Sequence, residues 1–261
     1  MMKLFFSLLL ITQYVQTIIV EHKEISAILA YLHESDLHRN TLVVLDIDNT
    51  IAHPTHLIGS DQWVSYHIEQ KMKEGLDVWH ATQAILPLYF EIQYIIDLIP
   101  VEELTVALIK HLQKLGITVV ALTLRSLQIH ERTVEQLSAI DIDFAVSAFG
   151  NEILYGPQEL PYLYNHGIIF CASQNKGVVL KHILDQLNHK PTKIIAVDDK
   201  THHLHAIKSA FVAHEIEVIG IRYSYLDEKV AQFDPAKAEH ELQLFFEGAL
   251  ISSKDFSFSY Y

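Results

Sequence analysis

Thr41-Leu-Val-Val-Leu-Asp-Ile-Asp-Asn-Thr50 is the most informative stretch of this chain. Residues 42–45 form a continuous apolar run rich in β-branched side chains, which is typical of a strand buried on both faces. The run ends in Asp46 and Asp48, and the alternation of a strand sends two carboxylates with this spacing to the same side. Like charges side by side are unfavourable there unless a cation or a reaction needs them. An ordinary acidic turn is the alternative interpretation.

Strand and helix patterns alternate along most of the remaining chain. Strands that alternate with helices form a parallel sheet with helices on both faces, so we expect an α/β fold with a Rossmann-like, doubly wound sheet. In such sheets ligands bind beyond the carboxyl ends of the strands, which is where Asp46 and Asp48 stand. Further strands are predicted at 117–122, 142–146, 193–197 and 216–222, and helices at 24–32, 104–115, 131–140, 176–187 and 201–211 and after residue 233.

An insert of residues 60–98, which contains no strand pattern, follows the first of these strands. Ser60 or Asp61 caps a first amphipathic helix, and Asp77 caps a second one. We expect the second helix to break near Pro87, because proline removes a helix hydrogen bond. The insert is therefore interpreted as a small helical cap that lies over the site and supplies its substrate specificity.

The N-terminus has the composition of a secretory signal peptide, residues 1–17. Lys3 forms a short basic region, and residues 4–11 form an apolar segment that is too short to span a bilayer. We expect export, to the periplasm or outside the cell, and a mature chain that begins near Ile18 and keeps no stable membrane anchor. An uncleaved amphipathic N-terminus is the alternative. The expected division of the rest is a core domain (18–59 and 99–261) and the cap (60–98).

Composition limits the classes of partner. The formal net charge is −13, whereas nucleic acids and anionic membrane surfaces select basic patches, so neither is expected as the main partner. A small phosphorylated substrate is compatible with this charge, provided that its site carries a metal ion and a lysine. Cys171 is the only cysteine among 261 residues, which excludes an internal disulfide and a thiolate zinc cluster.

Two groups of histidines allow a metal-site interpretation, and in both groups a simpler alternative is favoured. His53 and His56 flank Pro54 in an irregular segment, residues 51–59, which we expect to be a mobile loop. The histidines at 202, 203 and 205 fall in the first turn of a predicted helix. Not all of them can face one point, so a zinc site is disfavoured there.

Polar residues suited to chemistry stand at the ends of three predicted strands and at the start of one helix. The motifs are Leu-Asp-Ile-Asp-Asn-Thr (45–50), Ala-Leu-Thr (121–123), Asn-Lys-Gly (175–177) and Val-Asp-Asp (197–199). In this order they resemble the motifs of the haloacid dehalogenase-like (HAD) superfamily, over about residues 40–222. With Ser-Asp-Gln-Trp (60–63) and the signal-like N-terminus, the chain is also similar to a group of secreted bacterial HAD-like proteins of unknown function.

The resemblance implies a phosphatase or phosphotransferase that uses Mg²⁺. Asp46 would attack phosphorus and form an aspartyl-phosphate, while Asp48 would serve as general acid and base. A carboxylate attacks an anionic phosphate poorly unless a cation neutralises charge, which is the reason for the metal. Its protein ligands would be the Asp46 carboxylate, the Asp48 main-chain carbonyl and Asp199, with Asp198 in second place.

Thr123 and Lys176 would bind the phosphoryl oxygens in the same scheme. Lys176 stands at a helix N-terminus, where its charge and the backbone N–H groups favour an anion. The simpler alternatives are a strand-end hydroxyl that bonds its own backbone and a solvated lysine. Arg125 either touches the substrate or forms a surface ion pair.

Two other classes of protein compete with a phosphatase. The first is a secreted interaction or effector protein that keeps the HAD scaffold with little or no turnover. The second is a glycosyltransferase that holds a metal-bound nucleotide with Asp46 and Asp48. The glycosyltransferase hypothesis gives no role to Lys176 or to the pair Asp198-Asp199, so we rank it last.

Overall fold

The computed structural model describes residues 17–33, 40–150, 152–214 and 216–249. All of the predicted signal peptide except Thr17, and the C-terminal residues 252–261, lie outside this part. The main strands are β1 (Thr17–His22), β2 (Thr41–Leu45), β5 (Thr118–Thr123), β6 (Leu154–Tyr155), β7 (Leu163–Asn165), β8 (Ile168–Phe170), β9 (Lys193–Asp198) and β10 (Glu217–Tyr223). The helices are η1 (Ile25–Tyr31), α1 (Asp61–Lys73), α2 (Val78–Ile95), α3 (Leu104–Lys114), η3 (Leu127–Ile129), α4 (His130–Ala139), η4 (Ala145–Ser147), α5 (Lys176–Gln186), α6 (Thr201–Phe211), α7 (Asp227–Ala231) and α8 (Pro235–Phe246).

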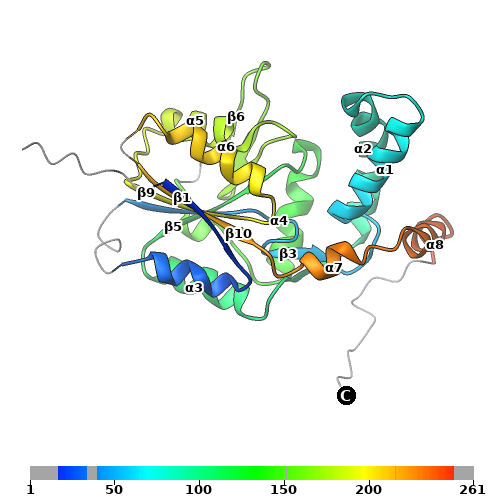
Figure 1. Cartoon of the computed structure of the whole chain (residues 1–261), viewed down its shortest axis with the longest axis horizontal. Helices are drawn as coiled ribbons and strands as arrows, with labels where there is room; N and C mark the ends of the chain where they lie inside the picture. The colour runs from blue at the N-terminus through cyan, green and yellow to red at the C-terminus, as the bar shows by residue number, and fades with distance from the viewer. Residues whose placement is uncertain (1–16, 34–39, 151, 215, 250–261) are drawn as a thin grey trace, which may run out of the picture.

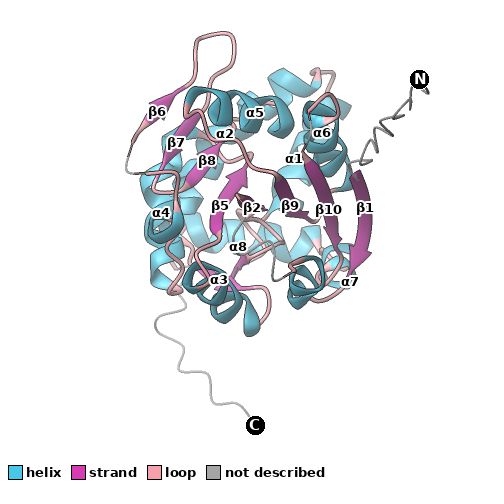
Figure 2. Cartoon of the chain, turned by 90° about the vertical axis from the view of Figure 1, so that its left-hand side faces the viewer, coloured by secondary structure: helices cyan, strands magenta, loops and turns pink. Residues whose placement is uncertain are grey.

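These strands form one sheet in the order β1-β10-β9-β2-β5-β8-β7-β6, which Figure 2 shows side by side. In this order, each pair of neighbouring strands from β1 through β10, β9, β2 and β5 to β8 is parallel. Strand β7 is antiparallel to both of its neighbours, β8 and β6. Strand β2 lies between β9 and β5, near the middle of the parallel part. The motif that follows β2 therefore stands beside the carboxyl ends of two other strands.

Helices cover both faces of the sheet, as predicted. Val43 and Leu45 of β2 belong to the apolar cluster that includes η1, α3 and α4, and Leu42 and Val44 belong to the cluster that includes α5 and α6. Figure 1 shows α3 on one side of the sheet and α5 and α6 on the other. Because these four side chains are at most 2% exposed, the strand is buried on both faces. The predicted α/β fold with a doubly wound, mostly parallel sheet is confirmed.

Helix α8 packs with the two helices of the insert. Trp63 of α1, Ile92 of α2 and Leu242 of α8 belong to one apolar cluster, separate from the two clusters on the sheet. The predicted caps of the insert are present, since Ser60 Oγ accepts a hydrogen bond from Trp63 N at 3.1 Å and Asp77 Oδ1 accepts one from His80 N at 3.0 Å. The helical cap is thus completed by residues from the C-terminal end of the chain.

The prediction of a mobile loop around His53 and His56 is wrong. Strand β3 (Ala52–Pro54) pairs antiparallel with β4 (Leu98–Pro100), and together they form a small ribbon at the base of the cap. His53 is only 8% exposed. The partner strand lies on the far side of the insert, so no pattern local to residues 51–59 indicates the pairing.

The predicted break near Pro87 is also absent, because α2 is continuous from Val78 to Ile95. Pro87 lies on the exposed side of the helix, where water can satisfy the carbonyl that loses its N–H partner. Ile85, Tyr89 and Ile92 are buried on the other side and hold both halves of the helix against the cap.

The strand predicted at 142–146 is wrong as well. This segment contains Ile142 and Phe144, which pack into the core, but Val146 is 69% exposed and the chain forms only the short η4. The position beside β5 is taken by β8, which pairs with it in parallel register. Residues 17–22, which the pattern did not single out, add the edge strand β1 next to β10.

Gly59 gives a test of how tightly the cap is packed on its connecting segment. Its φ is +71°, and an added Cβ would lie 2.6 Å from Ile96 Cδ1 and 2.8 Å from Ile92 Cγ2. We expect Gly59→Ala to lower the free energy of unfolding by about 2–4 kcal/mol, from backbone strain and overpacking together.

Gly75→Ala is the matched control, because Gly75 also has a positive φ, +104°, but no atom within 4 Å of the added Cβ. The control should lose only about 1 kcal/mol. Equal losses in urea unfolding would contradict the packing.

Candidate metal centre

A tight turn after β2 orients the two acids of the first motif. Asp46 continues the ladder, since its N–H donates to Val197 O at 2.9 Å. The Ile47 carbonyl then accepts hydrogen bonds from the backbone N–H groups of residues 50–52. Asn49 adopts a left-handed φ of +60°, which asparagine tolerates better than most residues. The turn separates the two side chains, so that Asp46 and Asp48 have different neighbours.

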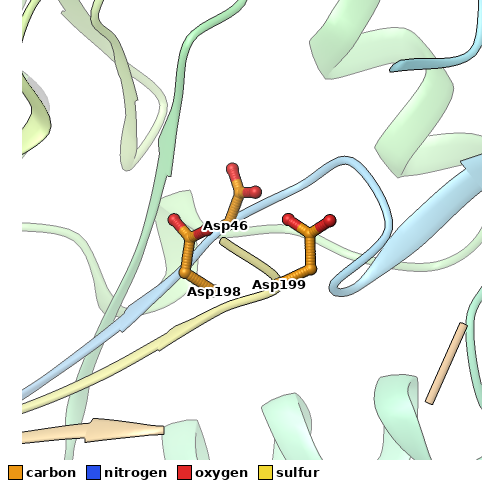
Figure 3. A group of neighbouring side chains, drawn as sticks. All are labelled: Asp46, Asp198 and Asp199. Atoms are coloured by element: carbon orange, nitrogen blue, oxygen red, sulfur yellow. The ribbon is translucent and has the colours of Figure 1, made fainter. Parts of the chain in front are cut away.

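Asp46, Asp198 and Asp199 converge beyond the ends of β2 and β9. One carboxylate oxygen of each lies within 4.8 Å of the others, and Figure 3 shows the three groups turned toward the same space. All three residues are at most 9% exposed. Parallel register explains the meeting, because Leu45 of β2 pairs with Val197 of β9 and each strand continues directly into its acids.

Lys176 bridges two of these acids. Its ammonium lies 2.7 Å from Asp46 Oδ1 and 2.7 Å from Asp198 Oδ2, and the side chain is fully buried. Asn175 caps α5 through a hydrogen bond from Val178 N at 3.1 Å, which fixes Lys176 in the first turn. Gly177 allows the close approach of α5 to α6, since an added Cβ there would lie 2.1 Å from Ala206 O.

Asp198 and Asp199 differ in how fully their oxygens are used. Asp198 Oδ1 accepts from Lys200 N at 2.8 Å and lies 3.1 Å from His203 Nδ1, in addition to the ion pair that Oδ2 makes with Lys176. Asp199 has its N–H bonded to Thr50 Oγ1 at 3.2 Å, and its carboxylate meets Lys200 Nζ at 3.3 Å. Asp199 therefore keeps more free oxygen acceptors than Asp198.

Burial and mutual repulsion act on the pKa values of this cluster. Burial raises the pKa of Asp46 well above its usual range, with Asp198 and Asp199 adding to the effect and Lys176 opposing it. Burial also raises the pKa of Asp199, to about 6, against the attraction of Lys200. At Asp198 burial by itself would raise the pKa, but the charges and hydrogen bonds of Lys176 and His203 outweigh burial and lower the pKa.

The donor set fits a hard divalent cation. All three ligand groups are carboxylates, which suit Mg²⁺, Ca²⁺ or Mn²⁺ rather than a soft metal. Ligand oxygens that lie within 4.8 Å of one another can be reached by a single cation with metal–oxygen distances of about 2.0–2.6 Å. A cation here would also relieve the repulsion that raises the pKa values of Asp46 and Asp199. This buried acidic group can therefore hold a metal ion.

Asp48 is engaged elsewhere, by Arg125. The guanidinium donates from Nε to Asp48 Oδ2 at 2.9 Å and from Nη2 to Asp48 Oδ1 at 2.8 Å. Arg125 is only 4% exposed, so the surface ion pair considered from the sequence is wrong. Its remaining nitrogen donates to Gln136 Oε1 at 2.8 Å and to Thr133 Oγ1 at 3.2 Å. Each oxygen of Asp48 thereby accepts one hydrogen bond from Arg125.

Thr123 ends β5 beside this pair and is 1% exposed. Its hydroxyl oxygen accepts a hydrogen bond from Arg125 N at 3.1 Å, the local backbone contact that was the simpler alternative for this residue. The hydroxyl proton is not used in that contact and can still be donated to an anion.

Sequence reasoning missed Lys200, and it considered Arg125 and His203 without placing either of them beside its acid. Lys200 also lies 3.0 Å from Asp61 of α1, which ties the cap to the acidic group. The sequence signal that could have identified Lys200 is its position directly after Asp199. For Arg125 and His203 the sequence holds no signal of which acid each would meet.

Comparison of the sequence with known protein families gives one match, over residues 21–252, to the family described as "Protein of unknown function (DUF2608)". The chain belongs to this family. No solved structure matches it.

Similar proteins occur in three chlamydial species and are each called "Putative outer membrane protein". The one from Chlamydia pneumoniae is 27% identical over 70% of this chain and 69% of its own length. Those from Chlamydia muridarum and Chlamydia trachomatis are 25% and 23% identical, each over 71% of this chain and 69% of their own length. Among the helices of the described residues, none is long and apolar enough to cross a membrane.

The raised pKa of Asp199 gives a test of the acidic group without any substrate. Because the folded pKa, about 6, exceeds the ordinary value of about 4, the metal-free protein loses stability as pH rises between these values. We expect Asp199→Asn, with a chelator present, to be more stable than the parent at neutral pH by up to about 3 kcal/mol, and equal to it below about pH 4. Mg²⁺ should stabilise the parent and not the variant in urea unfolding. If Mg²⁺ does not change the stability of the parent in urea unfolding, the metal site is contradicted.

Proposed function

We propose that this protein is a Mg²⁺-dependent, HAD-like phosphatase, which hydrolyses phosphomonoesters or transfers their phosphoryl group through an aspartyl-phosphate on Asp46. The observation that carries the proposal is the convergence of Asp46, Asp198 and Asp199 around Lys176, beyond the carboxyl ends of parallel strands. A small phosphorylated molecule is the substrate class, and the net charge of −13 argues against nucleic acid as a partner.

The metal would be held by Asp46, by the main-chain carbonyl of Asp48 and by an acid of the pair after β9. We favour Asp199 over Asp198, because the oxygens of Asp198 already accept from Lys176 and from Lys200 N. When bound, Mg²⁺ would neutralise charge on the phosphate oxygens and so make attack by a carboxylate feasible.

Asp46 would form a bond to phosphorus as the ester P–O bond breaks, and Asp48 would give its proton to the leaving oxygen. Asp48 would then take a proton from the water that attacks phosphorus, and that attack releases inorganic phosphate and free Asp46. Lys176 would hold a phosphoryl oxygen from its place in the first turn of α5, and Thr123 would donate its free hydroxyl proton to another.

The contact with Arg125 places a condition on this scheme. Both Asp48 oxygens accept hydrogen bonds from Arg125, so Asp48 would carry its proton on a remaining lone pair unless one of these bonds opens. Arg125 is bonded to Gln136, whose amide donates to Ile96 O at 3.0 Å and to Gln93 O at 3.2 Å in the cap helix and its end. Substrate-driven movement of the cap is a route by which Asp48 would be freed.

We further propose that the protein is exported, to the periplasm or outside the cell, without a stable membrane anchor. The signal-like composition of residues 1–17 supports export. The outer-membrane names of the chlamydial relatives agree with a location beyond the cytoplasm.

Replacement of the nucleophile tests the proposed reaction. Asp46→Asn should abolish Mg²⁺-dependent hydrolysis in a screen of phosphomonoesters while the circular dichroism spectrum stays unchanged. Asp185→Asn is the control, since Asp185 is a surface residue whose side chain is 63% exposed. If the parent itself shows no turnover with any phosphomonoester, the interaction or effector role on a HAD scaffold becomes the better explanation.

Asp48→Asn tests the general acid. Such catalysis is typically worth about 100- to 10,000-fold in rate, and the loss should be largest for alkyl phosphates, whose leaving groups need a proton. An activated aryl phosphate should lose less in the first step, which burst kinetics can separate from hydrolysis of the intermediate. Equal losses for the two substrate types would exclude Asp48 as the acid.

A further inference from the structure

A cavity of about 100 Å³ lies beside the acidic group, on the side of the C-terminal helices. Its walls come from the turn after β2, from β3, from the first turn of α1, and from α7 and α8. Ligand sites for whole small molecules are usually about 300–1,000 Å³, so this space suits one part of a ligand rather than a complete one.

Two side-chain amides on the cavity wall have unused hydrogen-bonding groups. Asn49 is 3% exposed, and its Nδ2 has no partner, while Gln62 Oε1 is buried without a partner. The two amides bond each other through Gln62 Nε2 and Asn49 Oδ1 at 3.3 Å. If both amides were flipped, one donor and one acceptor would still be left over. Buried polar atoms are normally satisfied, so an unused pair on a cavity wall points to a ligand.

Lys229 supplies a positive charge to the cavity lining. Its ammonium lies 3.2 and 3.4 Å from the two ring nitrogens of His53. His53 Nδ1 also lies 2.9 Å from Pro54 O, which leaves Nε2 as the acceptor for Lys229. Burial, then the charge of Lys229, lowers the pKa of His53 to about 4, so this imidazole is neutral at pH 7. Within the described residues no carboxylate forms an ion pair with Lys229, and burial alone lowers its pKa.

The carboxylate in the cavity wall already has hydrogen-bond donors. Glu241 Oε2 accepts hydrogen bonds from Leu57 N at 2.7 Å and from Ile58 N at 3.1 Å. His56 Nδ1 lies 4.0 Å from the same oxygen. Among the described side chains that line the cavity, the ammonium of Lys229 is thus a charge that no carboxylate pairs with, and the residue is exposed to solvent.

The part of the cavity wall that carries Asn49 and Gln62 is connected along the chain to residues of the acidic group. Asn49 stands on the same turn as Asp46, one residue after Asp48. Gln62 follows Asp61, which pairs with Lys200 at 3.0 Å, and Lys200 in turn meets Asp199 at 3.3 Å. The cavity therefore adjoins the turn that carries Asp46 and the end of α1 that contacts Lys200.

We propose that this cavity is a subsite for a second negatively charged group, a carboxylate or a phosphate, on the organic part of the substrate. Lys229 and the unused N–H group of the Asn49–Gln62 amide pair are its donors. The inference rests on the proposed phosphatase function and narrows its substrates to small phosphomonoesters that carry a further anion.

A matched pair of ligands tests the subsite, because 3-phosphoglycerate differs from glycerol 3-phosphate by a carboxylate in place of a hydroxymethyl group. Calorimetry on the Asp46→Asn protein with Mg²⁺ measures binding without turnover. We expect 3-phosphoglycerate to bind about 10-fold or more tightly, as a charge-assisted hydrogen bond provides. In the Lys229→Gln background this ratio should fall to about 1, and Lys229→Arg should largely restore it. Lys237→Gln, at a lysine side chain that is 76% exposed, should keep the ratio of the parent.

The outcomes separate the subsite from the reaction. If the parent shows no turnover, but 3-phosphoglycerate still binds more tightly than glycerol 3-phosphate in a way that depends on Lys229, the subsite is supported and the phosphatase function is contradicted. If the parent and Lys229→Gln both turn over substrate with the same preference for 3-phosphoglycerate over glycerol 3-phosphate, only the subsite is contradicted. The subsite alone is also contradicted if 3-phosphoglycerate does not bind at millimolar concentration. Comparison with 1,3-propanediol bisphosphate assigns the second anion, since the tighter of the two ligands identifies a phosphate or a carboxylate.

Discussion

Three buried carboxylates that crowd together at the ends of β2 and β9 are the constraint on which the rest of the structure depends. Their repulsion is opposed by Lys176, which needs the capped first turn of α5 and the close α5–α6 contact at Gly177. The pKa values of Asp46 and Asp199 remain raised even so, which means that the compensation is incomplete. Such residual strain in a buried acidic group is characteristic of a site that completes its charge balance with a ligand.

A second buried polar system joins this centre to the cap. It runs from Asp48 through Arg125 and Gln136 to Gln93, whose amide donates to Gly59 O at 2.8 Å. Arg125, Gln136 and Gln93 are each at most 4% exposed, so the hydrogen bonds are shielded from water. Because a half-satisfied buried network is costly, movement of the cap and release of Asp48 are expected to be linked.

The cap draws on both halves of the chain, and this arrangement shapes the space beside the centre. Helix α8 packs on α1 and α2, and Glu241 from α8 caps the backbone of residues 57 and 58. Lys229 of α7 is brought against His53 of β3 in the same region. The space next to the acidic group is thus shaped partly by residues almost at the C-terminal end of the described chain.

The sequence by itself determined the α/β class, the strands that carry Asp46, Thr123 and Asp198, the helix that begins at Lys176, and the cap helices, because periodicity and caps are local signals. It also singled out the three acids that meet, since strands of a parallel sheet end on the same edge. Tertiary structure decided which partner each polar group has. The Arg125–Asp48 pair, the β3–β4 ribbon, the use of β8 beside β5 and the docking of α8 all join segments distant in sequence, and their energies depend on packing and desolvation that no local pattern encodes.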